Sequence, residues 1–186
     1  MATEPATHWL KPLFDPDQDP LLGAPDAPIM LVEYGSYACP HCRAAHERII
    51  DLRDQLGDRV AHAFRHRPVP GNELAMRAAE LAERAAAAGK FWKAHVALMT
   101  RSADLREEDL DDIARELDLP PASTAASKRA AKRVQRDIQG AEASGVMVTP
   151  TFFINGRRHY GPYDIATLSA AVRAAGAHAL ATAGSD

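Results

Sequence analysis

Cys39 and Cys42 are the only cysteines of the chain, and they stand in the order Cys-Pro-His-Cys. A close pair in an otherwise cysteine-free chain is typical of thiol redox chemistry or of half a metal site, whereas a small secreted disulfide scaffold needs more cysteines. Pro40 favours the first position of a helix, which would place Cys39 at the helix N-terminus. There, free N–H groups and the helix dipole stabilise a thiolate. We therefore predict that Cys39 attacks a disulfide and that Cys42, one turn later, resolves the mixed disulfide.

His41 lies between the two cysteines. Its imidazole could donate a hydrogen bond or a partial positive charge to the Cys39 thiolate. Such a contact would favour the reduced protein, so it would make the disulfide a stronger oxidant. We predict this role for the His41 side chain.

A zinc site is the main alternative for the cysteine pair. His46 follows Cys42 by four residues, which places both on one face of a helix. The chain has no second C-x-x-C pair to complete a tetrahedral site. We therefore expect no metal, and we consider two cysteines that only pack in the core to be a weaker alternative still.

Glu33 stands six residues before Cys39, inside the apolar run Ile29–Tyr34. If its side chain points beneath the helix that begins at Pro40, burial would raise its pKa. It could then relay a proton for Cys42. The alternative is a carboxylate at the strand end that faces solvent, and the residues alone leave the two interpretations even.

Pro150 follows Thr149 near the start of a predicted strand. A cis peptide bond there would turn the chain and expose the backbone of Thr149. A trans proline in an edge strand is the alternative, and the residues alone favour it, because cis is a small minority of X-Pro bonds.

The pattern of apolar residues predicts an α/β fold around a mixed central sheet. A strand–helix–strand unit should be parallel, and Asn155-Gly156 predicts a hairpin that adds an antiparallel pair. The expected elements are strands at 29–34 and 60–65, a helix from about 40 to 56, about four helices within 72–145, strands at 148–154 and 157–160, and a last helix from Asp164 to about Ala175.

These elements suggest a division of the chain into three parts. Residues 1–28 hold six prolines and form an extended N-terminal arm, which Trp9, Leu10, Leu13 and Phe14 could pack against the body. Residues 29–71 and 146–178 form the core, and 72–145 form an inserted helical domain.

Composition points to a soluble globular protein. The net charge is −3, from 22 basic and 25 acidic residues, so neither nucleic acid nor a membrane is expected as a partner. Residues 1–28 lack the basic start and apolar stretch of a signal peptide. We expect a cytoplasmic protein, or a periplasmic one if a leader had been removed.

Two separated stretches resemble the DsbA-like branch of the thioredoxin superfamily. They are 32–42, which contains Cys-Pro-His-Cys, and 145–156, which contains Thr149-Pro150. Between them, 64–66 and 89–95 are similar to the helical insertion of that branch. The resemblance implies a thioredoxin-like core with an inserted α-helical domain, and it covers about residues 28 to 175.

The resemblance also implies roles for individual residues. Pro150 would be cis and would lie beside the cysteine pair, the backbone of Thr149 would hold a substrate chain in strand-like pairing, and Glu33 would be the family's buried acid. No bound cofactor is implied. Substrates would be protein or small thiols and disulfides, with glutathione or a dedicated partner recycling the pair.

Other functions remain open on the same fold. One is a kappa-class-like glutathione-dependent enzyme, although such relatives do not need the second cysteine. Another is a redox-linked chaperone or metal-binding module. The sequence does not fix the direction of exchange (oxidant, reductase or isomerase), the natural substrates or the oligomeric state.

Overall fold

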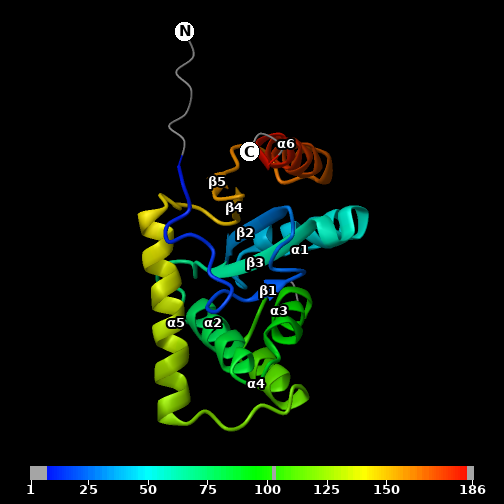
Figure 1. The fold of residues 1–186 in the computed structure, drawn as a ribbon. Coiled ribbons are helices and arrows are strands. Elements are labelled where there is room, and N and C mark those ends of the chain that lie inside the picture. The colour runs from blue at the N-terminus through cyan, green and yellow to red at the C-terminus, as the bar shows by residue number, and fades with distance from the viewer. Residues whose placement is uncertain (1–7, 102–103, 184–186) are drawn as a thin grey trace.

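A five-stranded mixed sheet forms the centre of the molecule (Figure 1). The computed structural model describes residues 8–101 and 104–183. Strand β2 (Ile29–Gly35) is parallel to β3 (Val60–His66), β4 (Thr151–Ile154) pairs antiparallel with β2, and β5 (Arg157–Arg158) pairs antiparallel with β4. This confirms the predicted α/β class and mixed sheet. In order across the sheet, the strands are β1 (Leu21–Leu22), β3, β2, β4 and β5.

The two faces of the sheet carry separate apolar layers. Because side chains alternate along a strand, Leu31 and Glu33 of β2 share one face, while Val32 and Tyr34 share the other. Helices α1 (Pro40–Leu56) and α6 (Ile165–Ala183) cover the first face. The N-terminal segment and the end of α5 (Thr124–Ala143) cover the second. A short 3₁₀ turn, η1 (Gly57–Arg59), leads from α1 into β3.

Four helices occupy the chain between β3 and β4 (Figure 1). They are α2 (Glu73–Ala86), α3 (Phe91–Thr100), α4 (Glu107–Glu116) and α5. Asn72 and Ser123 cap α2 and α5, because their side chains accept the N–H of the third residue after them. The apolar layer of this block is continuous with Cys42 and Phe64, so the block packs directly behind the redox pair. Its status as a separate domain stays a prediction.

The N-terminal segment is less independent than the sequence suggested. Residues 1–7 of the expected arm lie outside the described residues, but β1, within the arm, pairs with β3. Arg65 of β3 is only 1% exposed. Its guanidinium donates to Asp19 Oδ2 at 2.7 Å and to the carbonyl oxygen of Leu13 at 2.9 Å. A buried guanidinium needs such partners, so the arm completes the core. Leu10 packs in that core, whereas Trp9 is half exposed.

The C-terminal elements differ from the prediction mainly in their bounds. Asn155 and Gly156 both have positive φ, +47° and +80°, as a tight hairpin turn requires. Strand β4 begins after Pro150 and not at Val148, because proline has no N–H for the ladder. Strand β5 ends at Arg158, and α6 continues beyond Ala175 to Ala183. In the part of the chain described, no helix is long and apolar enough to cross a bilayer.

Candidate active site

Cys39 is the N-cap residue of α1. Its backbone is extended, with φ −100° and ψ 116°, and Pro40 takes the first helical position, as predicted. The pKa of Cys39 is lowered from 9.0 to about 5, first by a hydrogen bond with the Cys42 side chain. A side-chain hydrogen bond from Thr149 and the backbone N–H groups of Cys42 and His41 act in the same direction. The N-terminus of α1 therefore holds a thiolate at neutral pH.

Cys42 has the opposite character. It is completely buried, and its sulfur accepts a hydrogen bond from the Ser36 N–H at 3.3 Å. Its pKa is raised, first by the hydrogen bond with Cys39, then by burial and by the charge of Glu33. Cys39 and Cys42 are not joined by a disulfide in this structure. The pair thus combines one ionised sulfur near the surface with one protonated sulfur beneath it.

The His41 side chain does not point at the Cys39 sulfur. Its Nδ1 lies 3.1 Å from the hydroxyl oxygen of Tyr163, at the surface. The backbone N–H of His41, and not its imidazole, is the group that favours the Cys39 thiolate. The predicted residue is therefore at the site, but it acts on the sulfur through its main chain.

Glu33 lies beneath α1 and is 1% exposed, which excludes the solvent-facing alternative. Burial is the largest cause of a raised pKa at Glu33, partly offset by His62. Glu33 Oε2 lies 3.3 Å from His62 Nε2. The charge of Glu33 also acts on Cys42. A buried carboxyl group with a raised pKa is suited to proton transfer.

Thr149 and Pro150 lie against the redox pair although they are more than a hundred residues away in sequence. The peptide bond between them is cis, which the resemblance implied and the residues alone did not favour. The carbonyl oxygen of Thr149 is 3.5 Å from Cys39 Sγ. Just before them, Met147 is 82% exposed and Val148 is 64% exposed. An exposed segment with apolar side chains therefore borders the Cys39 sulfur.

Sequence reasoning missed a group of buried histidines behind the pair. His46, considered as a zinc ligand, lies in the core, and His95 is fully buried as expected for a core residue. His62 was not singled out. The sequence did contain a signal for His62. Side chains alternate between the two faces of a strand, so His62 and Phe64 of β3 share one face of the sheet with Glu33 of the paired strand β2.

A second buried polar group anchors the helical block to the sheet. His66, Glu83 and Asp137 bring their ligand-type atoms within 4.8 Å of one another. His66 Nε2 is 2.9 Å from Glu83 Oε1, and Arg133 Nε is 3.5 Å from Glu83 Oε2. Arg136 Nη1 lies 3.8 Å from Asp137 Oδ1. Guanidinium groups thus balance both carboxylates, as in a structural ion-pair network.

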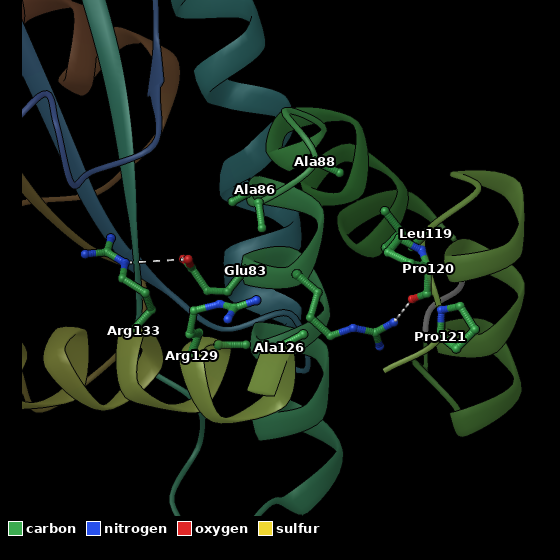
Figure 2. A pocket seen from close by; sticks show the side chains of 12 residues that line it. Glu83, Ala86, Ala88, Leu119, Pro120, Pro121, Ala126, Arg129 and Arg133 are labelled. Carbon is green, nitrogen blue, oxygen red and sulfur yellow. Dashed lines mark hydrogen bonds and ion pairs between the residues drawn. The ribbon is translucent and has the colours of Figure 1, made fainter. Parts of the chain in front are cut away.

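Glu83 also borders a cavity of about 370 Å³ between α2, α5 and the segment 119–121 (Figure 2). Its walls are mainly alanine, leucine and proline, with Arg84, Arg129 and Arg133 among the lining residues. In Figure 2 the ion pair between Glu83 and Arg133 joins α2 to α5 at one side of this cavity. The network therefore fixes the two longest helices of the block against each other.

Comparison with known proteins agrees with this geometry. A family model described as thioredoxin matches residues 16–174. A thioredoxin-like oxidoreductase from Silicibacter pomeroyi is 31% identical, with a TM-score of 0.73 over 87% of this chain and 93% of that one. BdbD from Bacillus subtilis is 21% identical, with a TM-score of 0.73 over 86% and 94%.

The chain is also 48% identical, over 98% of its length, to part of the Na(+)/H(+) antiporter NhaA of Nitrosospira multiformis. It spans only about 30% of that curated relative. The family model and the structural likeness each cover most of the chain, and the family model includes the cysteine pair and the Thr149–Pro150 segment. The chain therefore belongs to the thioredoxin family, and its fold is that of the DsbA-like thiol–disulfide oxidoreductases.

Proposed function

We propose that this protein exchanges disulfides with protein thiols through Cys39 and Cys42. The observation that carries the proposal is the opposite ionisation of the two sulfurs at the start of α1. The pKa of Cys39 is about 5, whereas burial and hydrogen bonding keep Cys42 protonated. The Cys39 sulfur is therefore a thiolate that can attack, whereas the Cys42 sulfur stays protonated until Cys39 has reacted.

The first step is attack by the Cys39 thiolate on a substrate disulfide. A bond forms between Cys39 Sγ and one substrate sulfur, the substrate disulfide breaks, and the other substrate sulfur leaves as a thiolate. The N–H groups of His41 and Cys42 hold Cys39 in the reactive form before attack. Pro40 contributes by starting the helix where these N–H groups converge on the sulfur.

The second step is resolution by Cys42. Its sulfur must lose a proton before it attacks Cys39 Sγ, and Glu33 is the buried carboxyl whose charge acts on it. We propose that Glu33 accepts this proton. The bond between Cys39 and Cys42 then forms while the bond from Cys39 to the substrate breaks, which releases the second substrate thiolate. Oxidation of a substrate dithiol runs through the same steps in reverse.

The segment 147–150 is the proposed substrate-binding surface. The Thr149 backbone lies beside Cys39 Sγ, where it can pair with an extended substrate chain as an added strand. Met147 and Val148 are exposed and apolar, so they can cover apolar side chains of that chain. This arrangement favours protein substrates over small thiols.

The direction of exchange follows from the ionisation of Cys39. A stabilised thiolate favours the reduced pair, so the disulfide form should be an oxidant. In the cytosol, which we keep as the proposed compartment, glutathione would hold such a pair mostly reduced. Glutathione or a dedicated partner protein is then the proposed recycling agent.

The test is equilibration of the pair with glutathione, read by mass after thiol alkylation, together with insulin reduction. A potential above about −200 mV is the expected result, and one near or below about −270 mV would instead indicate a reductase. Cys39→Ala should abolish insulin reduction. Full activity in this variant, or a pair that never equilibrates with glutathione, would refute the proposed function.

A further inference from the structure

Several buried polar atoms behind the redox pair have no hydrogen-bond partner among the described groups. They are Glu33 Oε1, His46 Nε2 and His95 Nε2. A fourth, His62 Nε2, lies 3.3 Å from Glu33 Oε2 but is not aligned as a full hydrogen bond. Leaving such an atom unpaired in a core costs about 1–3 kcal/mol. Folded proteins avoid that cost, so a cluster of such atoms calls for a role other than stability.

These side chains lie next to one another in a series that runs from β2 to α1. Glu33 of β2 meets His62 of β3. The rings of His62 and His95 have centroids 6.4 Å apart, and those of His95 and His46 are 5.1 Å apart. His46 is the most exposed of the three imidazoles, at 6%, and lies one turn beyond Cys42 on α1. The series thus begins at Glu33, whose charge acts on Cys42, and ends at His46 on α1, whose Nε2 is buried.

Burial disfavours the charged form of His95 and of His46, the second and third imidazoles of the series. Burial lowers the pKa of His95 well below its ordinary value, and His62, His46 and His66 add to the effect. The pKa of His46 is also lowered, by burial and by His62, against a smaller opposing effect of Glu47. A neutral imidazole can accept a proton at one ring nitrogen and release one from the other.

Titratable groups face this series from each packed element, including Glu47 near His46 and His66 near His95. On α1, the charge of Cys39 raises the pKa of Glu33, and the charge of Glu33 raises the pKa of Cys42. Tyr37 places its hydroxyl oxygen 3.3 Å from His95 Nδ1. The nearest neighbours on α3 and β3 are the aromatic rings of Trp92 and Phe64, which do not titrate. Glu33 is the carboxyl that contacts His62, the first imidazole of the series.

We propose that His62, followed by His95 and His46, carries the proton of Cys42 away from Glu33. This inference rests on the proposed function. In the resolving step the Cys42 proton moves to the Glu33 carboxylate as the bond between the two cysteines forms. It then passes to His62 Nε2 and onward, while the substrate thiolate that leaves takes a proton from water. The electrons of the dithiol go to the substrate disulfide, and no other reactant is needed.

The test measures the two steps separately in His62→Gln. Reduced protein is mixed with a peptide disulfide, the reaction is stopped by acid and alkylation, and the mixed disulfide is followed by mass from pH 6 to 9. Attack by Cys39 should keep its rate. Resolution should slow at least about tenfold, because proton transfer by a placed group contributes about 10²–10⁴-fold, and its pH dependence should change. His46→Gln, nearer the surface, should slow resolution less, and His8→Gln, an exposed histidine, should not.

A double variant distinguishes proton transfer from a structural role. If His62 acts only through Glu33, then His62→Gln should cost little or nothing further when added to Glu33→Gln. An equal additional loss in that background would overturn the proposal. So would unchanged resolution in both His62→Gln and His46→Gln, and the second variant decides if the first does not fold. A wild-type protein that forms no mixed disulfide would refute the proposed function itself, with this path.

Discussion

Replacing Cys42 with alanine should raise the pKa of Cys39 from about 5 to about 6–7. The Cys42 side chain is the largest single contribution to the lowered value. A hydrogen bond to a charged group is worth about 1.5–3 kcal/mol, and one pKa unit corresponds to about 1.4 kcal/mol, so its loss should cost about 1–2 units. The N–H groups of His41 and of residue 42 remain in the variant, which is why the pKa should stop well short of 9.

The assay is the rate of Cys39 alkylation by iodoacetamide as a function of pH. Only the thiolate reacts, and Cys42→Ala has a single cysteine, so the midpoint reports Cys39 alone. At pH 7 the wild-type sulfur should be about 99% ionised. Cys42→Ser keeps a hydroxyl donor and should shift the midpoint less than alanine does. A Cys42→Ala midpoint still near 5, or a wild-type midpoint near 9, would refute the assignment of the hydrogen bond.

Three further results are expected. His41→Pro should raise the pKa of Cys39 and make the disulfide less oxidising, because proline lacks the N–H that faces the sulfur; equilibration with glutathione measures this. Glu33→Gln should slow resolution and raise stability at neutral pH. Because the pKa of Glu33 is raised in the folded protein, the stability that protonated Glu33 contributes is complete below about pH 4.5 and is lost as pH rises through the folded-state pKa. Urea unfolding from pH 4 to 8 measures this change. Asp19→Asn should cost about 3–5 kcal/mol of unfolding free energy, because it leaves the buried Arg65 without its carboxylate.

Two of these variants have a matched control. His41→Ala keeps the backbone N–H, so it should leave the Cys39 pKa almost unchanged; an equal shift in both variants would show that the imidazole matters. Asp17→Asn alters an exposed neighbour of Asp19 and should change stability by less than about 0.5 kcal/mol. A Glu33→Gln protein whose stability varies with pH as the wild type does would contradict the assignment to Glu33.

The sequence predicted those features of the site that depend on local order. Cys39, Pro40 and Cys42 fix a helix start by their types and spacing, and the hairpin at Asn155 follows from the positive φ that Asn-Gly tolerates. What sequence could not show is how distant side chains meet. The orientation of His41 depends on Tyr163, which a separate loop brings to it. The buried place of Glu33 depends on α1 crossing above β2, and local alternation alone left that open.

The same limit applies to the N-terminal segment. A run of prolines and acids is typical of an exposed arm, and nothing near Asp19 in sequence indicates that it is buried. Its partner, Arg65, is 46 residues away. A charged residue inside an apolar strand such as β3 was the available signal, because a guanidinium at that position must find a carboxylate from elsewhere in the chain.

The short outer strands of the sheet have a consequence for association with other polypeptides. Strands β1 and β5 are each two residues long, so neither edge offers a long template on which a neighbouring polypeptide could grow into an aggregate. The proposed docking backbone at Thr149 lies instead beside the reactive sulfur. A polypeptide substrate bound at Thr149 would therefore lie next to Cys39. The short edge strands, in turn, disfavour pairing of the sheet with another copy.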